Sequence, residues 1–300
     1  MKEQISNTLI NLSESQTLAM TRLSRELKAE GKDVISLSIG EPDFDTPDFI
    51  KAAAKKAIDE NYTHYTPVPG YPDLINAIVT KFKRDNNLTY QPNQIVVSTG
   101  AKHTLANISI SLLNAGDEVL LPAPYWVSYH EIVKIAGATP IGIPTTIDQD
   151  FKVNVNQIKS AITDKTRMIW LSTPCNPSGS VYAKEELYEI AQLLKDYPNL
   201  IIVSDEIYEH ISFTGKHESI AQFDFIKDQV ITVNGVSKGF AMTGWRIGYM
   251  GAPKWIADAC IKMQGQFTSG TCSIAQKAAQ AALEADPSCT LEMKKAFEKR

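Results

Sequence analysis

The sequence predicts an α/β fold in which helices are layered on a largely parallel sheet. Short apolar runs recur along the 300 residues, and helical patterns fall between many of them. That alternation is typical of strand–helix–strand units, which build layered α/β folds. The 43% hydrophobic content and the formal charge of −4 are ordinary for a globular chain with a large core.

Seven short apolar runs are the expected strands. A continuous run such as Leu200–Val203 is typical of a strand that is covered on both faces. In chain order the runs are Ile95–Val97, Val119–Leu121, Thr139–Ile143, Met168–Leu171, Leu200–Val203, Val230–Val233 and Ile247–Met250. The order of the strands within the sheet does not follow from these runs.

The expected helices carry apolar residues at helical spacing. Residues 103–113 and 186–197 each show one apolar face, and Pro198 ends the second helix. Alanine- and lysine-rich stretches near 52–58 and 275–285 also predict amphipathic helices. Residues 1–30 are polar with a helical pattern, and we expect an arm or part of a small domain there.

Composition argues against several classes of protein. The weak negative charge gives no sign of a nucleic-acid surface, and the basic cluster Lys81–Arg84 is interpreted as a solvated helix face. No stretch approaches the roughly 20 apolar residues of a membrane span, and the polar N-terminus lacks the apolar core of a signal peptide. The four cysteines show no metal-binding spacing, which favours free thiols in a reducing compartment. We therefore expect a cytoplasmic protein without a metal, a membrane or a nucleic-acid partner.

Lys238 is the first candidate for chemistry. It follows the apolar run 230–233, with Ser237 directly before it and Arg246 further along. A lysine at this place can form a Schiff base, while Ser237 and Arg246 can hold a phosphate. The combination favours pyridoxal phosphate as a cofactor; a solvated loop lysine is the alternative.

Asp205 is the second candidate, at the carboxyl end of the run 200–203. Open α/β sheets bind ligands at such ends, and a carboxylate there can keep a pyridinium nitrogen protonated. Tyr208 can donate to the phenolate oxygen of the same ring. Asp205 can instead cap the next helix. A metal site of Asp205, Glu206 and His210 is not expected, because the spacing fits no standard zinc or calcium pattern.

Residues 98–102, with the sequence Ser-Thr-Gly-Ala-Lys, join an expected strand to an expected helix. Such a turn presents free backbone N–H groups to an anion. It is neither a Walker loop nor a GxGxxG fingerprint, and many α/β turns look alike. Taken alone, this segment is a weak signal.

Together these segments resemble class I aminotransferases of pyridoxal-phosphate fold type I, most closely the bacterial aspartate aminotransferase subgroup. The shared motifs follow the family's order nearly from end to end. They are Ser38–Pro47, Tyr65–Pro67 with Gly70, Pro124–Tyr129, Asn176–Gly179 and the segments around Asp205 and Lys238. The resemblance implies a three-layer α/β/α fold with a mostly parallel seven-stranded sheet, and pyridoxal 5'-phosphate as the cofactor.

The resemblance also implies a role for each matching residue. Lys238 would carry the cofactor as a Schiff base and then move the α-proton of the substrate. Asp205 would face the pyridine nitrogen, Asn176 and Tyr208 the phenolate oxygen, and Trp126 the ring. The residues implied at the phosphate are Gly100, Ala101, Ser237 and Arg246, with Lys102 beside them and Tyr65 reaching over from a neighbouring subunit.

Substrate contacts follow from the same resemblance. Gly40 would offer its backbone to the substrate carboxylate, next to Trp126 and Asn176. The aspartate subgroup has a lysine at the place of Lys102 and a threonine matching Thr17, which implies a dicarboxylic substrate such as aspartate or glutamate. A surface helix lysine and a solvent-facing threonine are the alternatives.

The implied function is a transaminase that moves an amino group from an L-amino acid to a 2-oxo acid by ping-pong chemistry. A pyridoxal-phosphate carbon–sulfur lyase and a non-catalytic cofactor-binding module remain open, because fold does not fix function. The resemblance also implies a homodimer with shared sites, and Tyr65 lies in a Pro- and Gly-rich loop where a core tyrosine is unusual. An exposed loop tyrosine in a monomer is the alternative.

Two domains are expected: residues 1–45 as an N-terminal arm with part of a small domain, and 46–300 as the large cofactor-binding domain. Family members continue into a small C-terminal domain with an arginine that binds the substrate α-carboxylate. No position here matches that arginine, so we expect the chain to be a piece of a longer protein.

Overall fold

The computed structural model describes residues 4–38 and 40–300, which surround a seven-stranded sheet. The strands are β1 (Ile95–Ser98), β2 (Glu118–Pro122), β3 (Thr139–Ile143), β4 (Thr166–Ser172), β5 (Ile201–Asp205), β6 (Val230–Gly235) and β7 (Gly248–Gly251). Their order in the sheet is β1-β7-β6-β5-β4-β2-β3. Strands β2 to β6 run parallel to one another, whereas β7 is antiparallel to both of its neighbours, β1 and β6. All seven expected strands are present, and the predicted mixed sheet is confirmed.

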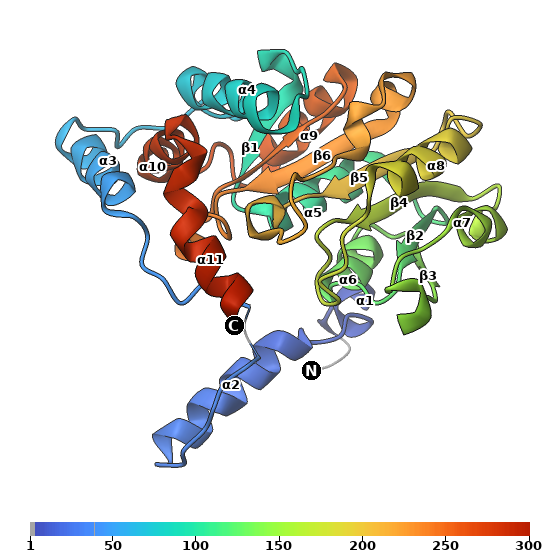
Figure 1. Ribbon diagram of the computed structural model, residues 1–300, viewed down its shortest axis with the longest axis horizontal. Helices are drawn as coiled ribbons and strands as arrows, with labels where there is room; N and C mark the ends of the chain where they lie inside the picture. The colour runs from blue at the N-terminus through green and yellow to red at the C-terminus, as the bar shows by residue number, and fades with distance from the viewer. Residues whose placement is uncertain (1–3, 39) are drawn as a thin grey trace.

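Helices cover both faces of this sheet and complete the three predicted layers (Figure 1). One face is covered by α4 (Pro72–Asn86), α7 (Val155–Ala161), α8 (Lys184–Leu194) and α10 (Ser273–Glu284), and α3 (Asp48–Asp59) packs against α10. The other face is covered by α5 (Ala101–Leu112), α6 (Ser128–Ile135) and α9 (Lys254–Phe267). The remaining helices are α1 (Asn7–Ile10), α2 (Gln16–Ala29) and α11 (Leu291–Lys299), and α2 projects away from the sheet.

The strands are apolar on both sides because they separate two cores. In β4, Met168 and Trp170 face the core beneath α5, α6 and α9, whereas Ile169 and Leu171 belong to the core beneath α4, α8 and α10. All four side chains are buried. Burying each such side chain contributes about 1.5–3 kcal/mol relative to leaving it exposed. The continuous apolar runs in the sequence therefore reflect two covered faces.

The prediction that Lys81–Arg84 form a solvated helix face is wrong for the first half of that cluster. Lys81 and Phe82 are 0% exposed, whereas Lys83 and Arg84 are exposed. The physical reason is an acid from far along the chain, Glu209, which pairs with the buried Lys81 ammonium.

The expected helices occur with shifted ends, since α5 begins at Ala101 and α8 ends at Leu194. The expected helical segment 1–30 contains α1 and α2; its residues 1–3, and Ile39 in the Ser38–Pro47 motif, lie outside the described residues. Within residues 4–38 and 40–300, no helix has both the length and the apolar character that crossing a bilayer requires.

Candidate active site

A cavity of about 540 Å³ lies at the carboxyl ends of the parallel strands. Ser172 and Asp205 are the last residues of β4 and β5, and Ser237 and Lys238 follow β6. Most of the residues with a predicted role line this one cavity: Thr17, Gly40, Ala101, Lys102, Trp126, Asn176, Asp205, Tyr208, Ser237, Lys238 and Arg246.

Gly100 does not itself line the cavity, but it lies directly against Arg246, which does. Its φ of 85° lies in the left-handed region that favours glycine. A Cβ at Gly100 would lie 2.3 Å from Nη2 of Arg246, so only glycine lets the guanidinium approach the start of α5. The guanidinium donates to the carbonyl oxygens of Thr243 at 2.8 Å and Thr99 at 3.5 Å. Free N–H groups at a helix start and an adjacent guanidinium together suit a phosphate or another anion.

Asp205 lies buried at the end of β5, with only 5% of its surface exposed. Tyr129 donates a hydrogen bond of 2.5 Å from Oη to Oδ2, and the N–H of Ile207 donates to Oδ1 at 3.3 Å. Burial raises the pKa of Asp205 to about 6, although both hydrogen bonds and Lys238 favour the charged form. A carboxylate in this environment is stabilised by a cation placed beside it, such as a protonated ring nitrogen.

Lys238 extends into the cavity opposite the Gly40 loop. Its Nζ donates to the carbonyl oxygen of Gly40 and lies 5.7 Å from the centroid of the Tyr208 ring. Burial lowers the pKa of Lys238; Glu41 opposes this effect, and Arg246 adds to it. A lowered pKa increases the fraction of neutral amine, which is the form that attacks a carbonyl or accepts a proton.

Tyr208 and Asn176 form a polar pair in the same cavity. The amide Nδ2 of Asn176 donates to the Tyr208 hydroxyl at 3.2 Å. Burial raises the pKa of Tyr208 to about 12, and Asp205 contributes to the increase. The phenol therefore stays protonated at neutral pH and remains a hydrogen-bond donor.

Lys102 and Trp126 form another wall. Nζ of Lys102 lies 4.7 Å from the centroid of the Trp126 ring, within reach of a cation–π interaction. Burial lowers the pKa of Lys102, and Arg246 lowers it further. Thr17, from α2, also contacts the cavity.

The structure adds residues to which no role was predicted. Tyr129, Ser172, Ile207 and Thr243 line the cavity. The only sequence signal for Tyr129 is its place in the Pro124–Tyr129 motif, because its partner Asp205 lies 76 positions away. Tyr65 lies outside the cavity and is 100% exposed.

The fold and the cavity define an α/β enzyme. Its site combines the amine of Lys238, the buried carboxylate of Asp205 and an anion cradle, which is formed by Arg246 and the N–H groups at the start of α5. Residues 32–300 match the sequence model of the family "aminotransferase class I and II", and the chain belongs to this family. The predicted family and the predicted aminotransferase activity are thereby confirmed. Membership implies pyridoxal phosphate as the cofactor.

Relatives and solved structures agree with this assignment. An aspartate aminotransferase of Bacillus sp. (strain YM-2) is 47% identical over 100% of this chain and 77% of that protein. An aspartate/prephenate aminotransferase of Nitrosomonas europaea is 46% identical over 99% of this chain and 75% of that protein. The aspartate aminotransferase structure from Rhizobium meliloti superimposes with a TM-score of 0.96 at 39% identity, over 99% of this chain and 74% of that one. The Thermus thermophilus aspartate aminotransferase with maleate gives 0.91 at 38% identity, over 98% and 75%.

Proposed function

We propose that this aminotransferase uses pyridoxal phosphate to exchange the amino group of aspartate or glutamate with a 2-oxo acid. The observation that carries the proposal is one cavity in which Lys238, Asp205 and the Arg246 cradle meet. The names of the Bacillus and Nitrosomonas relatives support aspartate as one substrate.

The cradle fits the phosphate of this cofactor. The close approach of Arg246 to Gly100 puts a guanidinium fork next to the free N–H groups at the start of α5. Two kinds of donor, both positive, suit a dianion better than either alone. We assign the phosphate to Gly100, Ala101, Ser237 and Arg246, with Lys102 beside it.

The rest of the cavity fits the cofactor ring. Asp205 is assigned to the ring nitrogen, because a buried carboxylate with a raised pKa gains most from a cationic partner. Asn176 and Tyr208 are assigned to the phenolate oxygen, and Trp126 to the ring face. When bound, pyridoxal phosphate supplies an electron sink that stabilises negative charge on the α-carbon of an amino acid.

Lys238 is the residue that we assign to proton transfer at the α-carbon. Burial lowers the pKa of its amine, so a larger fraction of it is neutral at neutral pH than for a solvated lysine. The neutral amine is the form that can accept a proton. Its hydrogen bond to the Gly40 carbonyl oxygen keeps Nζ inside the cavity. The Tyr208 hydroxyl stays protonated, because its pKa is raised, and it can donate a hydrogen bond that orients the cofactor ring.

Substrate selection is assigned to Lys102, Thr17 and Gly40. The Lys102 ammonium over Trp126 already faces the cavity, where it can pair with a second carboxylate. The Thermus thermophilus structure with maleate, a dicarboxylate, supports this substrate class. The backbone of Gly40 is assigned to the α-carboxylate.

We further propose a cytoplasmic homodimer with shared sites. Tyr65 is fully exposed and outside its own cavity, which leaves its hydroxyl free to reach the phosphate site of a second subunit. All four cysteines are free, as expected in a reducing compartment. The proposed division into residues 1–45 and 46–300 is supported by the projection of α2 away from the sheet (Figure 1).

The direct test incubates the protein and pyridoxal phosphate with aspartate and 2-oxoglutarate. Formation of equimolar oxaloacetate and glutamate supports the proposal, and Lys238→Ala is the matched inactive control. Release of pyruvate and ammonia from a sulfur amino acid, without amino transfer, would identify a carbon–sulfur lyase instead. A protein that neither binds the cofactor nor forms either product set would contradict both.

A further inference from the structure

The turn that follows β5 has two chemically different sides. Asp205 and Tyr208 line the cavity, whereas Glu206 and Glu209 extend into a buried polar cluster beside α4. Glu206 is 0% exposed and Glu209 only 7%. The same short segment thus carries residues of the cavity and two buried carboxylates.

Glu209 is held by the fully buried ammonium of Lys81. Asn86 bridges the pair, since Lys81 Nζ donates to its Oδ1 at 2.8 Å and its Nδ2 donates to Glu209 Oε2 at 2.7 Å. His210 Nε2 lies 3.2 Å from Glu209 Oε1. Burial alone would raise the pKa of Glu209. Lys81, and to a smaller extent His210, hold this pKa well below its usual range.

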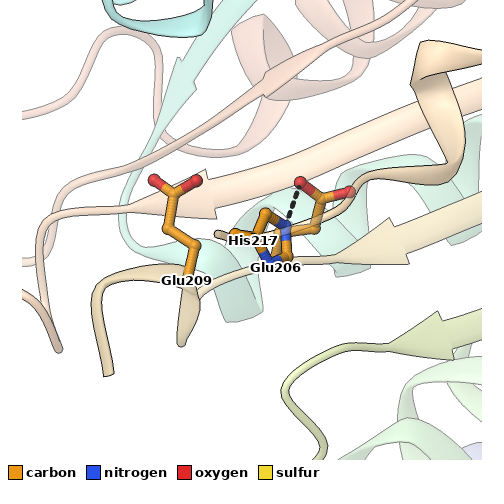
Figure 2. A group of neighbouring side chains, drawn as sticks. All are labelled: Glu206, Glu209 and His217. Atoms are coloured by element: carbon orange, nitrogen blue, oxygen red, sulfur yellow. Dashed lines mark hydrogen bonds and ion pairs between the residues drawn. The ribbon is translucent and has the colours of Figure 1, made fainter. Parts of the chain in front are cut away.

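Glu206 is anchored separately, and Figure 2 shows it with Glu209 and His217. Ser204 and Ser219 donate to its Oε1 at 2.8 and 2.6 Å, and His217 Nε2 lies 2.9 Å from Oε2. Potential ligand atoms of Glu206, Glu209 and His217 lie within 4.8 Å of one another. Glu206 is bonded by both serines and His217, and Glu209 by Asn86 and the Lys81 cation, so we interpret the cluster as an ion-pair network and not as a metal site.

The same turn packs tightly against the segment that carries Lys238. A Cβ at Gly235 would lie 3.1 Å from Ile207 Cδ1, and a Cβ at Gly239 would lie 2.7 Å from His210 Cδ2. The His210 ring also contacts Phe240 edge-on, with 5.3 Å between ring centroids. Any shift of this turn would therefore move Tyr208 relative to the lysine loop.

A buried ion pair is a poor explanation for stability alone, because well-packed apolar residues often replace such a pair without loss. Charged hydrogen bonds are directional, so they fix the orientation of the groups that they join. We propose that the Lys81–Glu209 pair is a positioning device that fixes the Tyr208 hydroxyl inside the cofactor site. The proposal rests on the cofactor site proposed above.

The test replaces the bridged pair by apolar residues of similar volume in the triple variant Lys81→Met/Asn86→Leu/Glu209→Met. Thermal unfolding first establishes that the variant is folded. The pH titration of the visible absorbance of bound pyridoxal phosphate is then compared with wild type. A hydrogen bond to the phenolate oxygen lowers the basicity of the conjugated ring system, so a displaced Tyr208 should raise the midpoint, by about one pH unit.

Two comparisons separate positioning from general destabilisation. In a Tyr208→Phe background the triple variant should cause no further shift, as a double-mutant cycle requires. The matched control is Lys152→Met/Glu186→Gln, which breaks a 2.8 Å pair that does not line the cavity and should leave the midpoint unchanged. An unshifted triple variant, or an equal shift in both backgrounds, would overturn the proposal.

A measurement without cofactor keeps this result separate from the proposed function. The ¹³Cζ resonance of Tyr208 in cofactor-free protein, assigned with Tyr208→Phe, should move in the triple variant and not in the control. If the triple variant fails to fold, Lys81→Gln/Glu209→Gln removes both charges and leaves no buried cation unpaired, and the same criterion applies. An unmoved resonance overturns positioning, whereas absence of cofactor binding by wild type contradicts only the proposed function.

Discussion

Replacing Asp205 by asparagine should stabilise the cofactor-free protein, although it removes a residue of the site. Burial raises the pKa of Asp205 from 3.8 to about 6. One pKa unit corresponds to about 1.4 kcal/mol, so holding this carboxylate ionised costs the folded protein up to about 3 kcal/mol. Asparagine keeps the shape, can still accept from Tyr129 and has no charge to bury.

The sign of this effect gives it a distinct pH dependence. Because the pKa of Asp205 is raised in the folded state, its contribution to the free energy of unfolding is fully present below about pH 4, where the carboxyl is protonated. That contribution is lost as the pH rises through about 6 and the carboxyl ionises. The advantage of Asp205→Asn in the free energy of unfolding should therefore be near zero at pH 4 and reach its full size above pH 7.

Denaturant unfolding of the cofactor-free proteins between pH 4 and 8 measures this difference, with the exposed Asp164→Asn as the matched control. A gain that does not change with pH, or a loss at pH 7, would refute the cost of burying this charge. In the loaded enzyme the same variant should lose far more turnover than cofactor affinity, because the phosphate contacts remain.

Four further outcomes are expected. Lys238→Ala should lose the yellow colour of the loaded protein and about a thousandfold or more in turnover; normal colour would exclude Lys238 as the attachment point. Gly100→Ala should weaken cofactor binding, measured by dialysis and absorbance, because a Cβ would meet the Arg246 guanidinium at 2.3 Å. Lys102→Ala should raise KM for aspartate about tenfold and spare alanine; equal losses for both substrates would argue against selective recognition. Mixing Tyr65→Phe with Lys238→Ala should give hybrid dimers more active than the average of the parents, while additive activity at verified subunit exchange would contradict shared sites.

Local features of the sequence were sufficient to predict the strands. The run Leu200–Val203 reads as a buried strand, and β5 covers Ile201–Asp205. The acid that ends it was predictable as a candidate for the same reason, since ligands gather at strand ends. Strand order and partners across the sheet were not predictable, because they depend on which faces pack together.

Lys81 shows the limit most clearly. Its spacing from Leu74 and Ile78 places it on the apolar face of α4, away from the solvated Lys83 and Arg84, but a lysine is rarely buried without a partner, so its type argued for the surface. Its burial depends on Asn86 and on the ion pair with Glu209, and the acid comes from another part of the chain. Tyr129 is similar, because its hydrogen bond to Asp205 exists only after α6 and β5 have packed.

The position of β7 has a consequence for how the chain folds. Edge strand β1 is attached to the sheet only through β7, which lies between β1 and β6 and runs against both. During synthesis β1 therefore stays unpaired until β7, which is encoded much later, has been made. Such non-local pairing slows folding and leaves strand edges open to wrong partners. The anion cradle can form only after these two strands have paired, because Gly100 follows β1 and Arg246 precedes β7. Binding competence should consequently be among the last properties that a nascent chain acquires.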